Sequence, residues 1–213
     1  SRWITSTPGR ASASRWATVL PATPGRRLPD ALGFRHVAES LIYEGHVWNV
    51  VAATFESPTG EHFERDIVRS PGAVGVVPLL RRDGVATVVF VRQYRPPLDR
   101  LVLEIPAGIR DVPDEPTEET AARELAEEVG LEAGRLEYLT NYYTSGGMTD
   151  SILHLYLATE LRAVTAAAHG PEEEHMEVVE LPLTQAVAMV MSGEIRDAKT
   201  VLGLLLVDRR LNS

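Results

Sequence analysis

Three glutamates near the middle of the chain, Glu124, Glu127 and Glu128, recur at the three- and four-residue spacing that places side chains on one face of a helix. Like charges four residues apart, as in Glu124 and Glu128, destabilise a helix by about 0.2 to 0.5 kcal/mol per pair. A divalent cation would offset this repulsion, and hard cations such as Mg2+ prefer carboxylate and phosphate oxygens. A solvated acidic helix face is the alternative interpretation.

The residues around these glutamates predict a helix from about residue 118 to residue 129. Thr117 is expected to cap its first turn, and Gly130 stands where such a helix ends. The apolar side chains that follow four-residue steps are expected to pack inward: Ala121, Leu125 and Val129.

The segment from Gly108 to Leu131, GIRDVPDEPTEETAARELAEEVGL, resembles the Nudix box of hydrolases that cleave nucleoside diphosphates linked to another moiety. The matching positions are Gly108, Glu115, Arg123, Glu124, Leu125, Glu127, Glu128, Gly130 and Leu131. Six residues separate Gly108 from Glu115 where the family usually has five, an insertion that a loop can absorb. The resemblance implies an α/β (α+β) Nudix fold, in which a mixed β-sheet is sandwiched between helices.

The same resemblance implies roles for individual residues of the box. Metal ligands are implied at the Ala107 carbonyl, Glu124, Glu127 and Glu128, with Mg2+ as the expected cofactor and Mn2+ as the alternative. Arg123 is expected to orient a carboxylate, with Glu115 as its partner.

Composition restricts the class of protein. The 213 residues, of which 44% are hydrophobic, suffice for one main domain and a smaller appendage. The longest apolar run, residues 201–207, is far below the roughly 18 residues of a membrane helix. The absence of cysteine excludes disulfides and thiolate catalysis, and a net charge of -9 argues against a broad nucleic-acid surface. Cytoplasm is the default location.

Three regions are expected along the chain. Residues 1–33, rich in Ser, Thr, Pro and Arg, predict a flexible basic extension. Residues 34–70 predict a small antiparallel sheet, because short strand-like runs are broken by turn signals such as Ser57-Pro58-Thr59-Gly60. Residues 71–213 predict the catalytic domain. Its apolar runs predict strands at residues 85–95, at residues 101–108 and from residue 136, and helices are expected at about 184–191 and 197–210.

Three further segments, VRQYRPPLDRLVLEIPAGIRD, HGPEEEHMEVVEL and SGEIRDAKTVLGLLL, resemble ADP-ribose pyrophosphatases, a branch of the same family. The likeness implies that Arg95 contacts the diphosphate. It also implies that the small sheet pairs across a homodimer, where Arg65 would reach the substrate. For both arginines, the alternative interpretation is a surface residue or a structural ion pair. Trp48 and Phe55 lie in the same predicted sheet and could stack on a purine base, and core packing is their alternative role.

The acidic run GPEEEHM is the expected source of the group that accepts a proton from water. It occupies the position where relatives carry a mobile loop with a catalytic glutamate. Glu174 is the first candidate for the proton acceptor and Glu172 is the second. The alternative interpretation of the run is a solvated acidic loop. His175 is expected at the surface.

One departure from the branch concerns the substrate. Ser145-Gly146-Gly147 stands where ADP-ribose enzymes commonly have Ser-Pro-Gly, and Ser151 stands where many relatives have glutamate, which leaves the role of Asp150 open. The expected reaction is metal-dependent hydrolysis of a nucleoside diphosphate sugar, ADP-ribose first, to AMP and ribose 5-phosphate. The alternatives are GDP-mannose or UDP-glucose as substrate, or a Nudix domain that binds a nucleotide without cleaving it.

Overall fold

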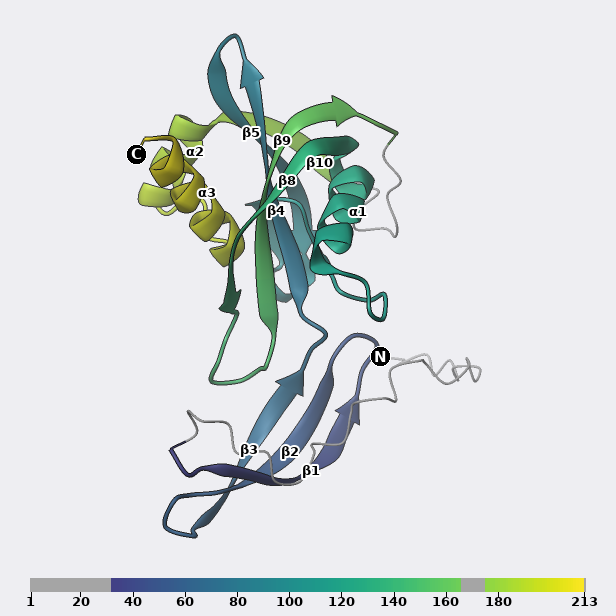
Figure 1. Cartoon of the computed structure of the whole chain (residues 1–213), viewed down its shortest axis with the longest axis vertical. Helices are drawn as coiled ribbons and strands as arrows, with labels where there is room; N and C mark the ends of the chain where they lie inside the picture. Colours follow the sequence, from purple (N-terminus) through teal and green to yellow (C-terminus); the bar gives the residue numbers. More distant parts are fainter. Residues whose placement is uncertain (1–31, 166–174, 213) are drawn as a thin grey trace, which may run out of the picture.

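The computed structural model describes residues 32–165 and 175–212, which form two sheets, one above the other in Figure 1. The smaller sheet has three antiparallel strands, β1 (Arg35–Glu44), β2 (Asn49–Glu56) and β3 (His62–Arg69). The larger sheet is mixed, because β4 (Ala73–Arg82) pairs in parallel with β9 (Ile152–Ala163). The predicted fold class, a mixed sheet with helices and a small antiparallel sheet, is confirmed.

The larger sheet has seven strands, five of which follow the order β10-β5-β4-β9-β8. The remaining two, β6 and β7, pair with β5 and β4 respectively. Besides β4 and β9, its members are β5 (Val85–Arg95), β6 (Arg100–Glu104), β7 (Ala107–Ile109), β8 (Leu131–Tyr143) and β10 (Glu177–Pro182). A short 3-10 turn, Pro96–Leu98, connects β5 to β6.

Helices cover both faces of the larger sheet: α1 (Thr117–Val129) lies on one face, and α2 (Leu183–Met191) and α3 (Ala198–Leu211) lie on the other (Figure 1). Alternate residues of β5 therefore enter different cores. Val88 and Phe90 pack with α2 and α3, and Val89 and Val91 pack with α1. None of the helices in the described ranges is long and apolar enough to cross a membrane.

The α1 helix follows its predicted pattern except at its first turn. Its predicted apolar face is buried, at Ala121, Leu125 and Val129. It ends at Gly130, whose φ of 63° suits glycine. The prediction that Thr117 caps the helix is wrong, because Pro116 holds that position without a side-chain cap. Thr117 is helical instead, and its hydroxyl lies 2.6 Å from the Tyr156 hydroxyl, a contact with β9.

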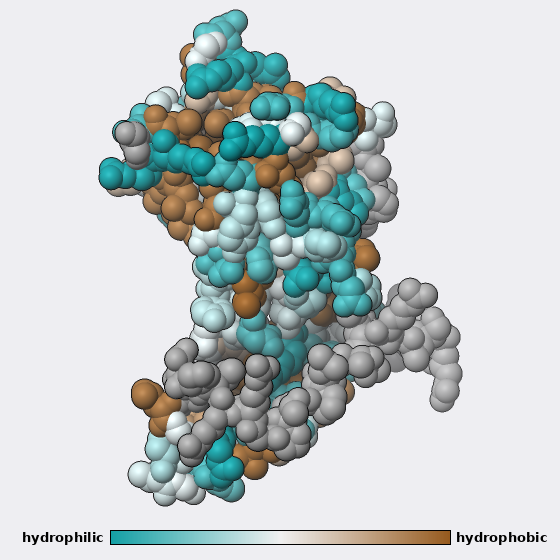
Figure 2. Space-filling view, in the orientation of Figure 1, coloured by the Kyte–Doolittle hydropathy of each residue, from teal (hydrophilic) through white to brown (hydrophobic). Residues whose placement is uncertain are grey.

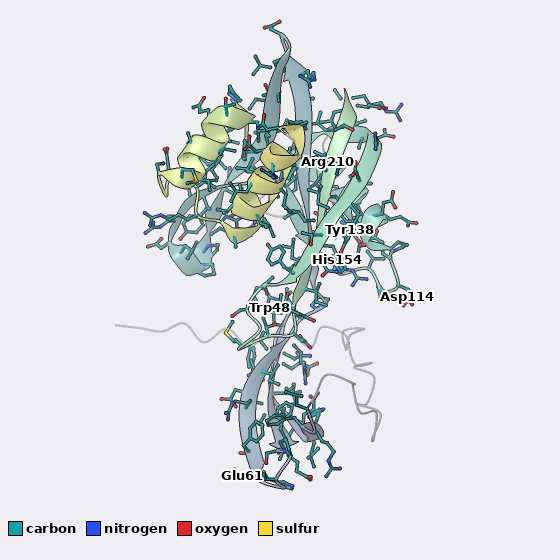
Figure 3. The ribbon with its side chains drawn as sticks, turned by 60° about the vertical axis from the view of Figure 1, so that its left-hand side comes forward. Trp48, Glu61, Asp114, Tyr138, His154 and Arg210 are labelled. Atoms are coloured by element: carbon teal, nitrogen blue, oxygen red, sulfur yellow. The ribbon has the colours of Figure 1, made fainter. Side chains whose placement is uncertain are left out.

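The smaller sheet has little core of its own. Within residues 32–70, only the side chains of Val51 and Ala53 are buried, and all of β1 is exposed. The sheet joins the larger domain through a backbone hydrogen bond from Val68 to the Met148 carbonyl, 2.9 Å long. In Figure 3, Trp48 lies at this junction and Glu61 at the far end of the sheet.

The surface of the larger domain differs between its two sides. In the face that Figure 2 shows, hydrophilic residues cover most of the α1 side, and hydrophobic residues are visible around α2 and α3. The polar α1 side is the one that carries the acidic residues of the predicted box.

Candidate active site

The acidic face of α1 packs against the short strand β7. Glu124 and Glu128 are each only 8% exposed, although both are charged residues. Glu128 accepts a hydrogen bond of 2.9 Å from the backbone N–H of Ala107. This bond fixes the helix relative to the backbone segment that begins the predicted box.

Gly108 leaves the space in which the Glu124 carboxyl group lies. A Cβ atom added at position 108 would be 1.9 Å from Cδ of Glu124, well inside van der Waals contact. Any side chain at this position would therefore displace the Glu124 carboxylate. The first glycine of the box is required by this close approach of a side chain to the backbone.

Arg123 stands among four carboxylates. Its Nη1 donates to Glu124 at 2.8 Å and to Glu127 at 3.0 Å. Its Nε and Nη2 donate to the two oxygens of Glu115 at 3.3 and 3.2 Å. Asp111 lies 3.4 Å from Nη2. One guanidinium is thus shared by four carboxylates.

The surroundings of these carboxylates shift their pKa values in opposite directions. Burial, together with the neighbouring charge of Glu127, raises the pKa of Glu124 to about 7 despite the opposing effect of Arg123. Hydrogen bonds from Arg123 hold the pKa of Glu115 below its usual value. A buried carboxylate with a raised pKa, beside other carboxylates, is typical of functional sites.

A cavity of about 500 Å³ opens beside these residues. Its lining includes Gln93, Arg95, Ala107, Gly108, Asp111, Arg123, Glu124, Glu127 and Glu128. Carboxylates and a backbone segment supply oxygen donors, the type that hard divalent cations prefer. In the described parts of the chain, no three acidic or histidine side chains converge as a ready-made cation site. Glu124 and Glu127 instead direct their carboxylates to Arg123.

The two predicted substrate-binding arginines lie in different places. Arg95, at the end of β5, lines the cavity and forms a two-pronged pair with Glu104 at 2.8 and 2.7 Å. Arg65 is exposed on β3 of the smaller sheet, with its guanidinium carbon 5.0 Å from the centre of the Phe63 ring. Within one chain, the structure brings only Arg95 to the acidic residues.

The aromatic residues considered for base stacking also differ. Phe55 stacks on Phe63 with ring centres 5.6 Å apart, which makes it a packing residue of the smaller sheet. Trp48 is 52% exposed at the junction between the two sheets.

Asp150 belongs to the junction of the two sheets rather than to the lining of the acidic cavity. Its carboxylate accepts from Arg69 Nη1 at 2.9 Å and from the Ser70 N–H at 3.1 Å. The loop that contains Gly146 therefore helps to hold the smaller sheet on the larger domain. The two predicted proton acceptors, Glu172 and Glu174, lie outside the described residues.

Sequence reasoning missed several polar residues of the site. Gln93 and Asp111 line the cavity, and Glu104 lies beneath Arg95 with only 2% of its surface exposed. One signal could have found Gln93, because it continues the inward alternation of Val89 and Val91 on β5 with a polar side chain. Glu104 gave no comparable signal, since its partners lie elsewhere in the sequence.

Comparison with known proteins identifies the family. Residues 69–202 match the model of the NUDIX domain. The chain is 40% identical over 164 residues to an ADP-ribose pyrophosphatase of Bacillus subtilis, covering 77% of this chain and 86% of the relative. It is also 40% identical over 135 residues to a GDP-mannose pyrophosphatase of Citrobacter koseri, covering 60% and 70%.

A solved structure gives the same fold. The crystal structure of an ADP compounds hydrolase superposes with a TM-score of 0.71 at 22% identity, covering 84% of this chain and 94% of the other. The family match includes the acidic helix α1, the strand β7 and the cavity between them. The chain belongs to the Nudix family.

Proposed function

We propose that the protein hydrolyses the diphosphate bond of a nucleoside diphosphate sugar in a metal-dependent reaction. ADP-ribose is the first substrate, and AMP and ribose 5-phosphate are the products. The observation that carries this proposal is the pair of buried carboxylates on α1, Glu124 and Glu128, which line the same cavity as Glu127 and Arg95. The similarity to the Bacillus subtilis ADP-ribose pyrophosphatase supports the choice of substrate.

Nudix hydrolases generally use a divalent metal ion. We assign Mg2+ to this chain, with Mn2+ as the alternative, and propose the Ala107 carbonyl, Glu124, Glu127 and Glu128 as the residues that hold it. When bound, the ion supplies positive charge to the diphosphate oxygens and favours ionisation of a nearby water.

The protein residues bind and orient the substrate around this centre. Arg95 uses two of its five N–H groups on Glu104, and the others suit the oxygens of a diphosphate. Arg123 holds Glu115 and restrains Glu124 until the site is loaded. These contacts orient the phosphorus atom for attack by water from one side.

We propose Glu174 as the acceptor of the water proton, with Glu172 as the second candidate. A positioned general base contributes roughly 100- to 10,000-fold to a rate. The substitution Glu174→Gln should therefore lower kcat by a factor in this range, and Glu172→Gln should leave kcat within about threefold. The reverse pattern would move the assignment to Glu172.

We propose that the protein is a homodimer that pairs through the smaller sheet. Exposed apolar side chains on β1 support this, since a three-stranded sheet needs a partner to bury them. The residues concerned are Val37, Leu41, Ile42 and Tyr43. In such a dimer, Arg65 of one chain would reach the substrate of the other. Light scattering should give twice the chain mass of 23.4 kDa, and a monomer mass would remove the proposed role of Arg65.

A substrate panel tests the reaction. The purified protein is incubated with Mg2+ and ADP-ribose, GDP-mannose, UDP-glucose or 8-oxo-dGTP, and the nucleotide products are separated by chromatography. AMP released from ADP-ribose with the highest kcat/KM is the expected result. No turnover of any compound would favour a domain that binds nucleotides without cleaving them.

The second candidate function is hydrolysis of another sugar nucleotide. The similarity to a GDP-mannose pyrophosphatase and the presence of Gly146 at the expected proline position favour it.

We propose that the partner of the protein is a small-molecule substrate, and that it has no nucleic-acid or membrane partner. We also propose that the protein works in the cytoplasm, which cell fractionation can check.

A further inference from the structure

Lys199 is the only lysine in the chain, whereas the other basic residues, 20 of the 21, are arginines. It lies at the start of α3 and is only 8% exposed. Its ammonium group donates to Oε2 of Glu104 and, at 3.0 Å, to Oδ1 of Asp197. The family resemblance assigns no role to this buried lysine.

The Glu104 carboxylate accepts hydrogen bonds from both Lys199 and Arg95. Arg95 Nη2 and Lys199 Nζ both donate to Oε2, and Arg95 Nε donates to Oε1. Because a guanidinium paired at two points lies nearly in the plane of its carboxylate, the direction of Arg95 follows the orientation of Glu104. Lys199 holds that carboxylate from the side of α3.

The first turn of α3 also holds the backbone of the same segment. Thr200 Oγ1 accepts the Ile105 N–H at 2.9 Å and donates to Asp197 at 2.6 Å. Asp197 caps α3 through the Thr200 N–H at 3.0 Å. The start of α3 therefore contacts the Glu104 side chain and the adjacent backbone, two residues before Ala107.

Arg95 lies between two cavities and lines both of them. It lines the acidic cavity of about 500 Å³ and also a second one of about 880 Å³, whose lining includes Glu104, Asp197 and Lys199. The guanidinium thus faces the proposed substrate site on one side, and on the other it is held by Glu104, which contacts Lys199 of α3. In Figure 1, α3 and α1 lie on opposite faces of the sheet, so α3 supports the site from behind.

We infer that Lys199 is a positioning residue for Arg95: it fixes the Glu104 carboxylate, which in turn holds the guanidinium in the orientation that binds the diphosphate. The kinetic part of this inference rests on the proposed function. A purely structural role for Lys199 would affect stability without acting through Arg95.

Lysine suits this position because its ammonium group is compact and donates in three directions. Two of these directions are used, on Glu104 and Asp197. An arginine at position 199 would carry a larger, planar group that would crowd the ion pair between Arg95 and Glu104. Lys199→Met keeps the approximate length of the side chain and removes both bonds, so it isolates the contribution of the ammonium group.

The first measurement needs no substrate. The Nε–H signal of Arg95 is followed by 15N NMR and identified by its loss in Arg95→Ala. In Lys199→Met, a shifted Arg95 signal with about tenfold faster hydrogen exchange is expected, because a looser Glu104 protects it less. The control Arg82→Met breaks an exposed pair with Glu180 and should leave the signal unchanged. An unchanged signal in Lys199→Met would overturn the inference.

The second measurement is a double-mutant cycle with ADP-ribose and Mg2+. Lys199→Met should lower kcat/KM by about 10- to 100-fold, mainly through a higher KM, since small displacements of binding groups have effects of this size. In the Arg95→Ala background, the same change should alter kcat/KM by less than about twofold. Equal factors in the two backgrounds would show that Lys199 does not act through Arg95.

Two further outcomes are also decisive. If Lys199→Met does not fold, Lys199→Gln enters the same cycle, because its amide keeps one polar contact and still removes the charge. If the wild-type protein turns over none of the sugar nucleotides, the proposed function fails, and the Arg95 signal alone decides whether Lys199 positions the guanidinium.

Discussion

Two buried glutamates in the larger domain have opposite electrostatic surroundings. Burial alone would raise the pKa of Glu104, but Arg95 and Lys199 lower it below its usual value. Burial and the charge of Glu127 raise the pKa of Glu124 to about 7, although Arg123 opposes the shift. Two cationic side chains, Arg95 and Lys199, pair with Glu104, whereas Arg123 is shared between Glu124 and other carboxylates. The difference indicates that Glu104 is a supporting group, and it agrees with the proposal that Glu124 is a ligand of a cation from outside the chain.

The largest expected effect concerns Glu128, which lies beside Glu124 on the acidic face of α1. Glu128→Gln removes a proposed metal ligand but keeps an oxygen that can accept the Ala107 N–H. We expect kcat/KM for ADP-ribose to fall by about 1000-fold or more, roughly 4 kcal/mol of transition-state stabilisation. Circular dichroism should show an unchanged fold. Turnover like that of the wild type would refute the assignment of Glu128 as a ligand.

The same substitution should change stability in opposite directions in the two groups. Glu104→Gln leaves Arg95 and Lys199 without their shared anion, which should lower the free energy of unfolding by about 3 to 5 kcal/mol. Glu124→Gln removes a disfavoured charge and should raise the free energy of unfolding of the metal-free protein at pH 8 by on the order of 3 kcal/mol. Urea denaturation with a chelator present measures both, and equal signs would contradict the comparison.

The pH dependence of stability should separate the two groups further. The folded-state pKa of Glu124 lies above its ordinary value of 4.5, so its ionisation destabilises the metal-free protein as the pH rises from about 4.5 through 7. The folded-state pKa of Glu104 is lowered, so its stabilisation is present above about pH 4.5 and is lost on acidification. Denaturation between pH 4 and 8 should show that Glu124→Gln removes the decline above pH 4.5, whereas a persistent decline would point to another group.

A smaller effect should come from the space beside Glu124. Gly108→Ala would place a methyl group against the Glu124 carboxyl, which must then move away from its position. We expect kcat to fall by about 10- to 100-fold while Tm changes by only a few degrees, because the displaced atoms are at the end of a flexible side chain. Gly147→Ala is the matched control, since its added Cβ meets nothing within 4 Å. Full activity in Gly108→Ala would show that the Glu124 position is not critical.

Much of the fold could be predicted from local patterns. The alternation and turn signals predicted β5 at residues 85–95, and Gly130 marked the end of α1. The start of β8 was harder to predict from local patterns. A strand was expected from residue 136, whereas the structure begins it at Leu131. There Glu132 pairs with Arg162 of β9, a partner that no local pattern reveals. Pro106, which lacks an N–H group, divides the expected single strand into β6 and β7.

The residues of the site also fall into those that local patterns predicted and those that they did not. Helical spacing placed Glu124 and Glu128 on one face, and the structure shows both against β7. The contact between Glu104 and Lys199 joins residues that are 95 positions apart, so spacing could not reveal it. Local periodicity therefore predicts residues that one helix presents together, while contacts across the sheet require the fold.

Binding of Mn2+, with Mg2+ as competitor, measured by electron paramagnetic resonance of the free ion, tests whether the carboxylates of α1 bind a divalent cation. The wild-type protein should bind the ion, and Glu124→Gln and Glu128→Gln should weaken binding by at least about 10-fold, the loss of roughly 1.4 kcal/mol or more. The control Arg82→Met removes a side chain that pairs with Glu180 and does not line the acidic cavity, so this variant should bind like the wild type. Equal Mn2+ affinity in all four proteins would contradict the account, because the carboxylates of α1 would then not be where the cation binds.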